Sequence, residues 1–277
     1  MLDIAYIRRS LDTKRIGHRI EHVESTGSTN DVVWQYIDAA AARRAGGEDE
    51  VDGLVVFTEQ QCAGRGRHGR TWESPRGASI LCSVALIEPL GCLSGGELSL
   101  LAAIALRDAV ASCTEIVPLI KWPNDLLVAG KKIGGILVEA RARDDGIRTY
   151  VVGIGLNCLQ QKGHFPAQLA DAATSLELES RAAITRETIA VALLHGLDRW
   201  LAPPRSWTSD TLRREWAARS EPVGRRVVVR CRGRVYSGSV VDVDPGAALV
   251  VQLDEGGVRA FNAADTTVVG GGANTAK

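Results

Sequence analysis

The chain has 277 residues, of which 45% are hydrophobic and 24% charged, the composition of a globular protein with room for one large domain and a small one. Its 33 basic and 33 acidic residues balance. This balance excludes an overall charge that would gather nucleic acid or an anionic membrane, so any basic function must be local. The N-terminus lacks the apolar run of a signal peptide, and no stretch is long enough to span a membrane. We therefore expect a soluble, cytoplasmic protein with no membrane partner.

Up to residue 113 the sequence predicts two helices with two strands between them. Residues 32–44, VVWQYIDAAAARR, carry apolar residues at helical spacing, and Gly46 is expected to end this helix. The three polar residues before it, Ser28, Thr29 and Asn30, are in position to cap it. The next expected elements are two buried strands and a buried helix: 54–60 (LVVFTEQ), 79–87 (SILCSVALI) and 96–113 (GELSLLAAIALRDAVASC).

The remaining sequence predicts the end of one domain and a second, smaller one. A strand from 116 is broken by Pro123, and residues 126–140 read as a hairpin whose turn is Ala129-Gly130-Lys131. The expected elements after it are a strand buried on both faces, an amphipathic helix and a short helix: 149–157, 185–201 and the residues around Leu212 and Trp216. Short alternating strands separated by RG, DPGA and DEGG turns then suit a small antiparallel barrel. We expect domains at 1–221 and 222–270, followed by a disordered tail at 271–277.

The cysteines and histidines form no pattern typical of a structural metal or of disulfides. None of the six cysteines belongs to a CxxC pair, and most lie in apolar runs, so they are expected to be reduced core residues. The five histidines show neither HExxH nor a zinc spacing with cysteine. We therefore expect no tightly bound metal.

The segment GRGRHGRTW, residues 64–72, contains GxGxxG, the pattern of dinucleotide-binding turns. Such a turn must open a helix, but the residues after Gly69 include Pro75 and Gly77, which argue against one. A second interpretation is an anion-binding loop, in which Arg65, Arg67 and Arg70 would close over an anion and shield it from water. A solvated basic loop and an RNA-contacting loop remain alternatives, although the neutral chain and scarce aromatic neighbours weaken the latter.

Two further stretches have a composition that suits a binding site for anions. KWPND, residues 121–125, places polar side chains directly after a strand end, where Lys121 and Asp125 would equally suit a surface ion pair. KKIGGILVE, residues 131–139, puts two lysines at a hairpin corner, followed by two glycines within a strand. Glycine weakens a strand unless something must approach its backbone closely. A lysine beside that opening is well placed to meet a carboxylate or phosphate.

Taken together, these stretches resemble the biotin protein ligases. The matching pieces are STN at 28–30, EQQCAGRGRHGRTW at 59–72, KWPNDLLVAGKKIGGILVE at 121–139 and GIGLN at 153–157. They occur in the family's order and, with the small C-terminal barrel, cover nearly the whole chain. The resemblance implies an α/β (α+β) fold: a mixed sheet with helices like that of class II aminoacyl-tRNA synthetases, plus an SH3-like C-terminal domain.

The resemblance also implies a two-step reaction. Biotin and ATP with Mg²⁺ would give biotinyl-5′-AMP and pyrophosphate, and a lysine of a biotin carboxyl carrier protein, such as that of acetyl-CoA carboxylase, would then displace AMP. Cations would offset the repulsion between the biotin carboxylate and the α-phosphate. No side-chain nucleophile is needed, which agrees with the lack of a GxSxG elbow or a Cys/His pair. A closing loop would protect the intermediate from water.

The resemblance assigns roles to individual residues. The catalytic residues would be Lys132, Arg67 and Asp125, with Asp125 orienting Lys132 or receiving the proton of the incoming amine. The biotin-binding residues would be Ser28, Thr29, Asn30, Gln61, Gly64, Arg65, Gly66, Arg67, Lys132 and Gly135. The nucleotide-binding residues would be Arg67, Arg70, Trp72, Asn124, Lys132 and Asn157. Structural alternatives remain open: the STN segment as a helix cap, Gln61 as a strand end, Trp72 as core, and Asn157 bonded to backbone at a strand end.

The sequence departs from the family pattern in two places. His68 replaces an arginine, which makes one charge dependent on pH, and GIGLN continues into Cys158-Leu159 without a second asparagine. STN begins too early for an N-terminal DNA-binding domain, so we expect no DNA partner. A monomer or a weak homodimer is expected. The competing functions are a lipoate–protein ligase, whose apolar substrate would leave Asn30 and Gln61 unsatisfied, and an RNA-binding module.

Overall fold

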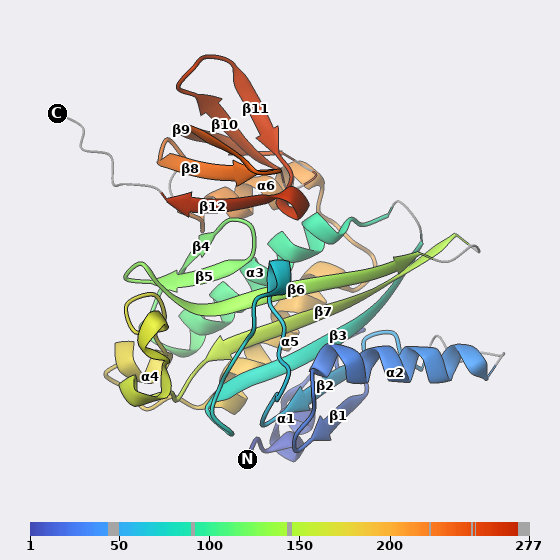
Figure 1. Cartoon of the computed structure of the whole chain (residues 1–277). Coiled ribbons are helices and arrows are strands. Elements are labelled where there is room, and N and C mark those ends of the chain that lie inside the picture. The colour runs from blue at the N-terminus through green and yellow to red at the C-terminus, as the bar shows by residue number, and fades with distance from the viewer. Residues whose placement is uncertain are drawn as a thin grey trace.

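The structure, a computed structural model, describes residues 1–43, 50–89, 92–142, 146–221, 223–244, 246 and 248–270. Two sheets organise the chain (Figure 1), a large mixed sheet of seven strands and an antiparallel sheet of five strands near the C-terminus. This confirms the expected α/β (α+β) class with a second, smaller β unit. The expected end of the first helix at Gly46 and the tail at 271–277 lie outside the described residues.

The large sheet has the strand order β1-β2-β3-β7-β6-β5-β4. Only β1 and β2 are parallel among these pairings; the remaining neighbours are antiparallel. The long central strands β3 and β7 pair from Ser79↔Asn157 to Pro89↔Ile147. The strands are β1 (Ile20–Val23), β2 (Val55–Thr58), β3 (Ser79–Pro89), β4 (Leu119–Lys121), β5 (Asp125–Val128), β6 (Lys131–Ala142) and β7 (Ile147–Asn157).

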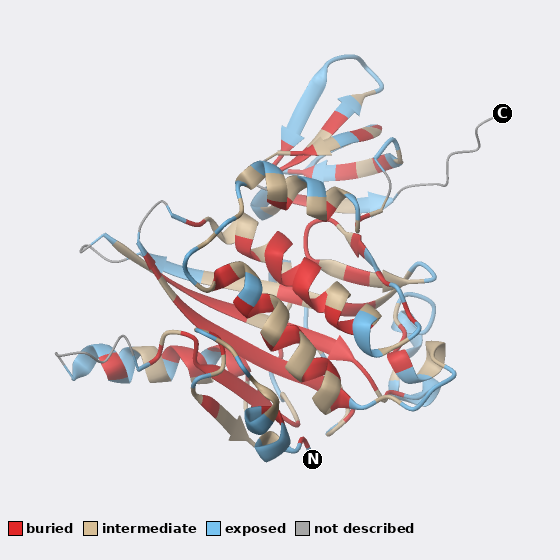
Figure 2. Ribbon diagram, turned by 180° about the vertical axis from the view of Figure 1, so that it is seen from behind, coloured by how far each residue is buried: buried red, intermediate tan, exposed pale blue. Residues whose placement is uncertain are grey.

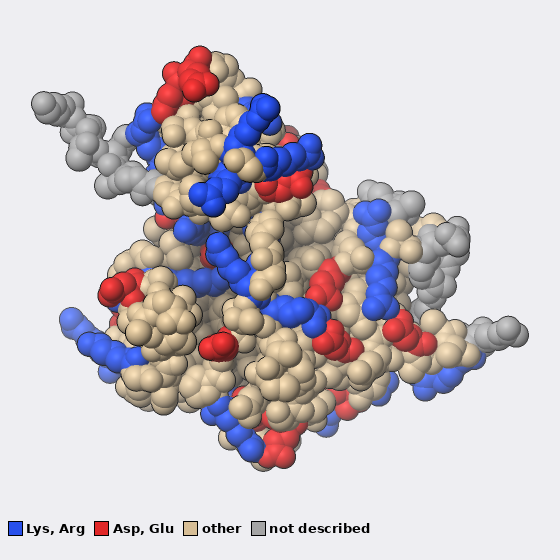
Figure 3. Space-filling model, in the orientation of Figure 1, with Lys and Arg blue, Asp and Glu red and all other residues tan. Residues whose placement is uncertain are grey.

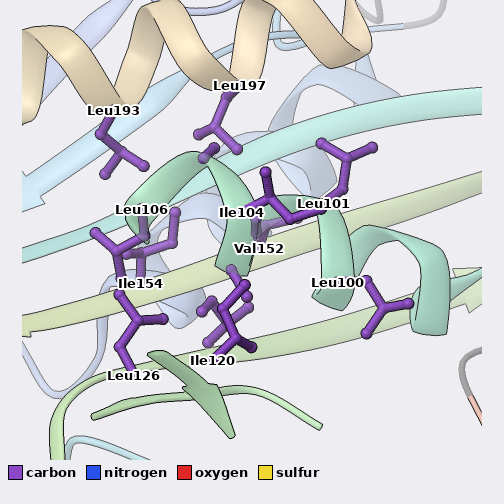
Figure 4. Packing of buried hydrophobic residues seen from close by; sticks show 14 of the residues in the cluster. Leu100, Leu101, Ile104, Leu106, Ile120, Leu126, Val152, Ile154, Leu193 and Leu197 are labelled. Carbon is purple, nitrogen blue, oxygen red and sulfur yellow. The ribbon is translucent and has the colours of Figure 1, made fainter. Parts of the chain in front are cut away.

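Helices cover both faces of this sheet. Helix α3 (Gly95–Cys113) lies on one face between the strands and α5 (Arg186–Leu201), as Figure 2 shows from behind. Its buried leucines and isoleucine pack against α5 on one side and against strand residues such as Val152 and Ile154 on the other (Figure 4). Helix α2 (Thr29–Ala42) packs on the opposite face, over β2, β3 and β7, with a small apolar cluster of its own. The functional residues described below lie on this second face.

The smaller sheet has the order β11-β10-β9-β8-β12, and all its pairings are antiparallel. Its strands are β8 (Arg226–Cys231), β9 (Arg234–Val243), β10 (Leu249–Leu253), β11 (Val258–Phe261) and β12 (Thr266–Gly270), with the short turn η4 (Ala263–Asp265) before β12. It is joined to α3 and the large sheet through α6 (Ser209–Ala217) and the Ile120–Ser220 bridge. The short elements elsewhere are α1 (Ile4–Ser10), η1 (Arg67–Gly69), η2 (Lys162–His164), η3 (Ala167–Leu169) and α4 (Leu176–Glu179).

Two sequence expectations are corrected by the structure. Thr29 and Asn30 lie in the first turn of α2 and not before it, and the side chain of Ser28 makes no cap hydrogen bond. All six cysteines are free, but only half of them belong to the core: Cys82, Cys158 and Cys231 are buried, whereas Cys62, Cys92 and Cys113 are exposed. Of the exposed cysteines, Cys113 ends α3, whereas Cys62 and Cys92 lie outside the helices and strands.

Candidate active site

A cavity of about 340 Å³ lies on the α2 face of the large sheet. The segment between β2 and β3 crosses in front of the sheet here, with η1 near its tip, and Figure 1 shows η1 reaching toward the C-terminal sheet. In the same orientation, basic side chains gather across the middle of this face, bordered by acidic ones (Figure 3). Residues 267 and 268 of β12 also line the cavity. The cavity therefore joins the residues that the sequence singled out to a wall from the C-terminal sheet.

The start of α2 supplies an uncharged end of the cavity, which we call the amide end: Ser28, Thr29, Asn30 and Gln61. Ser28, Thr29 and Asn30 are buried. The Gln61 side-chain oxygen accepts from the Thr29 backbone N–H at 2.8 Å and from its hydroxyl at 3.1 Å. Asn30 Oδ1 bonds with the hydroxyl of Ser83 at 2.6 Å, whereas Asn30 Nδ2 is buried without a partner. The amide end thus holds a fixed but unused hydrogen-bond donor, a group whose burial is costly unless a ligand satisfies it.

Glycines on the floor of the cavity make room for these side chains. A Cβ at Gly153 would come within 2.4 Å of Asn30 Oδ1, and one at Gly155 within 2.7 Å of the Trp72 ring. Gly135, paired with Gly155 across β6 and β7, would place a Cβ 3.1 Å from Lys132 Nζ. The close approach expected at the glycines of KKIGGILVE is therefore made by this chain's own side chains.

A cationic group forms the next part of the cavity, with Lys132 at its centre. Lys132 Nζ is 2.5 Å from Asp125 Oδ1 and 5.5 Å from the centroid of the Trp72 ring. The Trp72 indole N–H is buried without a partner. Asp125 therefore faces Lys132, and no Lys121–Asp125 ion pair is found in the described part of the chain. The hairpin brings these groups together because Asp125 and Lys132 lie on adjacent strands of the β5–β6 pair.

Arg67 and Arg70 face the same region from the loop. Arg67 Nη1 is 3.3 Å from Asn124 Oδ1, and its Nη2 donates to the backbone carbonyl of Ala263 in the C-terminal unit. Neither arginine has a carboxylate partner among the described residues. Burial lowers the pKa of the Arg67 guanidinium and the neighbouring Arg70 charge adds to this, while Asp125 opposes it. Arg67 remains charged at any ordinary pH, so an anion in the cavity would relieve this unfavourable environment.

Arg65 is arranged differently. Its guanidinium binds both oxygens of Asp31 at 2.7 Å and Glu139 Oε1 at 3.0 Å. Backbone bonds from Gly66 N–H to the Arg70 carbonyl and from Trp72 N–H to the Gly64 carbonyl close the loop into a short hairpin. The expectation that three guanidiniums close over an anion is thus corrected: the Arg65 side chain is held by two carboxylates, which leaves Arg67 and Arg70.

The two asparagines expected at the nucleotide are both held by the protein. Asn124 Nδ2 donates to the Ile136 carbonyl at 2.6 Å, and its oxygen accepts from Arg67. Asn157 Nδ2 donates to the Thr174 carbonyl at 3.0 Å, and its oxygen accepts from Gln160 at 2.9 Å. The structural alternative for Asn157, backbone satisfaction at a strand end, therefore describes its contacts.

The cavity brings together nearly all the residues that the sequence singled out. Of the residues to which the resemblance assigned roles, Gly64 alone is not among the lining residues, and it packs against Trp72. Sequence reasoning missed the cavity residues of the segment after β7 and of β12, which carry no motif: Gln160, His164, Phe165, Leu169, Thr267 and Val268. It also missed Ser83, which holds Thr29 and Asn30 from beneath.

The described residues form neither a membrane-spanning helix nor a cluster of metal ligands. None of the helices there is long and apolar enough to cross a membrane. Within the same ranges, His, Cys, Asp and Glu side chains do not gather in groups of three that would hold a metal ion.

Comparison with known proteins assigns the family. Residues 47–157 match the model of the biotin/lipoate A/B protein ligase family. The chain is 36% identical over 260 residues to the biotin–[acetyl-CoA-carboxylase] ligase of Mycobacterium tuberculosis, covering 90% of each protein. It is 32% identical over 200 residues to the ligase of the same name from Paracoccus denitrificans, covering 71% of this chain and 83% of the relative. The chain belongs to the biotin protein ligase family.

A solved structure supports the fold. The biotin protein ligase of Aquifex aeolicus, in complex with biotin and ATP, superposes with a TM-score of 0.73 at 20% identity. The match covers 91% of this chain and 98% of that one. The large sheet and the C-terminal sheet together are therefore the fold of this family.

Proposed function

We propose that the cavity joins biotin to ATP and delivers the activated product to a protein. The enzyme is an ATP-dependent ligase that activates biotin as biotinyl-5′-AMP and transfers it to a lysine of a biotin carboxyl carrier protein, such as that of acetyl-CoA carboxylase. Mg²⁺ enters as part of the MgATP substrate, where it offsets phosphate charge.

In the first step, a carboxylate oxygen of biotin attacks the α-phosphorus, the bond from that phosphorus to the β-phosphate oxygen breaks, and pyrophosphate leaves. The amide end holds the ureido ring: Asn30 Nδ2 donates to the ureido oxygen, while backbone at Arg65, Gly66 and Arg67 completes the pocket. Lys132 lies between the carboxylate and the α-phosphate, oriented by Asp125. Arg67 and Arg70 bind phosphate oxygens, so that the positive charge offsets repulsion between two anionic reactants.

In the second step, the carrier's lysine amine attacks the carbonyl carbon of the mixed anhydride. The bond to the AMP oxygen breaks, an amide forms and the amine loses a proton. Asp125, which lines the cavity beside Lys132, receives this proton. Until the carrier arrives, the loop at 64–72 and the Trp72 ring keep water from the anhydride.

One observation carries this proposal: the cavity changes character along its length. At the amide end, Asn30 Nδ2 is a buried donor without a partner. At the other end lie three cations: Arg67, Arg70 and Lys132. A small molecule with a polar, uncharged ring at one end and a carboxylate at the other matches this sequence of groups. The dithiolane ring of lipoate has no carbonyl to accept from Asn30, a loss of about 1–3 kcal/mol for the buried donor.

We also infer finer features of the architecture. The seven-stranded sheet is a core like that of the class II aminoacyl-tRNA synthetases, in a domain that ends near residue 221. The domain at 222–270, to which the five-stranded sheet belongs, is SH3-like. The distinct strand orders of the two sheets support this division. The contact from Arg67 to Ala263 supports a part for the smaller domain in closing the site.

The proposal is tested by supplying the purified protein with biotin and MgATP. We expect pyrophosphate release, biotinyl-AMP detected by mass spectrometry, and biotin on a carrier domain added afterwards. Lipoate in place of biotin serves as the control and is expected to give little product. No pyrophosphate with either acid would refute the ligase assignment, and product from lipoate alone would favour the second branch of the family. Retention of RNA on a filter, falling steeply with salt, would instead support the RNA-binding alternative.

A further inference from the structure

Beyond the assigned residues, the cavity contains an acceptor that is buried and unused. Gln160 lines the cavity, its side chain is 1% exposed, and its Oε1 has no hydrogen-bond partner. Three buried unpaired atoms belong to cavity residues: Asn30 Nδ2, Trp72 Nε1 and Gln160 Oε1. The first two are donors and only the third is an acceptor, so it calls for a ligand group with an N–H or O–H.

The orientation of the Gln160 amide follows from its neighbours. The Thr174 carbonyl must face Asn157 Nδ2, which turns Asn157 Oδ1 toward Gln160. Gln160 Nε2 donates to that oxygen at 2.9 Å and to the Ser79 hydroxyl at 2.7 Å. A flipped amide would set two acceptor oxygens against each other, so Oε1 is left as the free atom.

The position of Gln160 indicates which part of a ligand it meets. Gly153, Gly155 and Asn157 alternate along β7 and share the cavity face, with Asn30 over the first and the Trp72 ring over the second. Asn157 lies about 13 Å along the strand from Gly153. Gln160 beside it is therefore at the opposite end from the ureido donor. The cavity lining includes apolar and aromatic side chains that suit a flat aromatic group: Trp72, Phe165, Leu169, Ala172 and Ala173.

We propose that Gln160 is a specificity-determining residue for the nucleotide: its Oε1 accepts a hydrogen bond from the exocyclic amino group of adenine. The inference rests on the proposed function, since it requires that the cavity take ATP. Adenine presents an amino donor at its 6-position, whereas guanine presents a carbonyl oxygen, which would meet Oε1 as a second acceptor. Asn157 is a positioning residue here, because both ends of its amide are used to hold Thr174 and Gln160.

The experiment compares ATP with purine riboside triphosphate, which lacks only the amino group, as substrates for biotin-dependent pyrophosphate release. We expect the protein to favour ATP in kcat/KM by about tenfold or more, because the analogue leaves Oε1 unpaired. Gln160→Met should lower kcat/KM for ATP to near the value for the analogue and change the analogue's value little. Gln168→Met, an exposed glutamine in the same segment, is the matched control and should behave as the unsubstituted protein.

A purely structural role for Gln160 predicts a different pattern, an equal loss with both nucleotides, and that result would overturn the proposal. Equal use of ATP and the analogue by the unsubstituted protein would overturn it without any variant. Biotin binding by calorimetry should be unchanged in Gln160→Met, because the ureido end is distant. If Gln160→Met gives no cooperative melt, Gln160→Asn, which withdraws the amide by one methylene, supplies the same comparison. A protein that releases no pyrophosphate with any nucleotide refutes the ligase function itself, which is a separate outcome.

Discussion

Arg65 and Arg67 stand two residues apart in the same loop, yet their surroundings are opposite. Arg65 is ion-paired with Asp31 and Glu139, and the hydrogen bonds that it donates to Asp31 raise the pKa of its guanidinium further, against the effect of burial. Arg67 has no carboxylate partner among the described residues, and burial lowers its pKa. A cation with its counter-ion in place holds the loop, whereas a cation without one is available to an anionic ligand. Composition alone does not distinguish these two roles; the neighbours do.

The largest effect is expected from removing Lys132, the cation at the centre of the cationic part of the cavity. Lys132→Ala should lower biotinyl-AMP formation by at least about 100-fold, the usual effect of losing a group that stabilises transition-state charge. Its side chain is about one-third exposed at a hairpin corner, so thermal melting should change little. Lys131→Ala is the matched control: among the described residues its Nζ has a hydrogen bond to the Ala170 carbonyl alone, and the activity of this variant should stay near normal. Normal adenylation in Lys132→Ala would remove this lysine from the mechanism.

The next largest effect is expected from replacing Arg67, the arginine without a carboxylate partner among the described residues. Arg67→Gly removes the contacts to Asn124 and to the Ala263 carbonyl, so the loop should retain biotinyl-AMP less well. We expect biotin on the lysines of an unrelated protein to rise about tenfold, in keeping with the loss of a charged hydrogen bond. The measurement is a streptavidin blot of serum albumin incubated with the enzyme, biotin and MgATP. Albumin labelling by Arg67→Gly that stays at the level of the unsubstituted protein would mean that the loop does not retain the intermediate.

Features that depend on residues close in sequence could be predicted, whereas those that depend on residues far apart could not. Periodicity predicted α3, α5 and the long strands, because those patterns are local. The Gly-Arg loop, KWPND and KKIGGILVE were correctly brought to one cavity, because the resemblance fixes their relative placement. The partners of Arg65 were not predicted, since Asp31 and Glu139 are 34 and 74 residues away. Asp31 belongs to no motif, and Glu139, the last residue of KKIGGILVE, had been given no role.

The same reason explains the residues that sequence reasoning missed. Gln160 carries no signal in its own stretch, and its meaning depends on Asn157, Ser79 and Thr174 folding around it. Gly153 and Gly155 were seen only as part of GIGLN. Glycine is needed at these two positions because a Cβ there would clash with the side chains of Asn30 and Trp72. The roles of these residues depend on contacts between segments far apart in the sequence, which no local sequence pattern shows.

A smaller effect is expected on the paired side of the comparison. Arg65→Gly should lower adenylation by only about two- to fivefold, because partly exposed ion pairs contribute about 0.2–1 kcal/mol. The comparison variant is Arg67→Gly, which makes the same backbone change. Asp31→Asn should have an effect similar to that of Arg65→Gly, and the double variant should be no worse than either single one. Additive losses would show that Arg65 acts through something other than Asp31.

The smallest effect concerns how the stabilisation by the Asp31–Arg65 ion pair depends on pH. The Arg65 hydrogen bond lowers the pKa of Asp31 while burial opposes it, so the folded state binds the Asp31 proton less readily than the unfolded chain does. Such a group stabilises the fold fully above the unfolded pKa, about 3.9 for aspartate, and the stabilisation is lost as the pH falls through the lower folded value. The difference in unfolding free energy between the natural protein and Asp31→Asn should therefore be constant, at a few tenths of a kcal/mol, from pH 7 to pH 5. It should shrink only below about pH 4. Urea unfolding at these pH values measures it. A difference that already disappears between pH 7 and pH 5 would show that Asp31 is not the carboxylate that holds Arg65, and would leave Glu139 to do so.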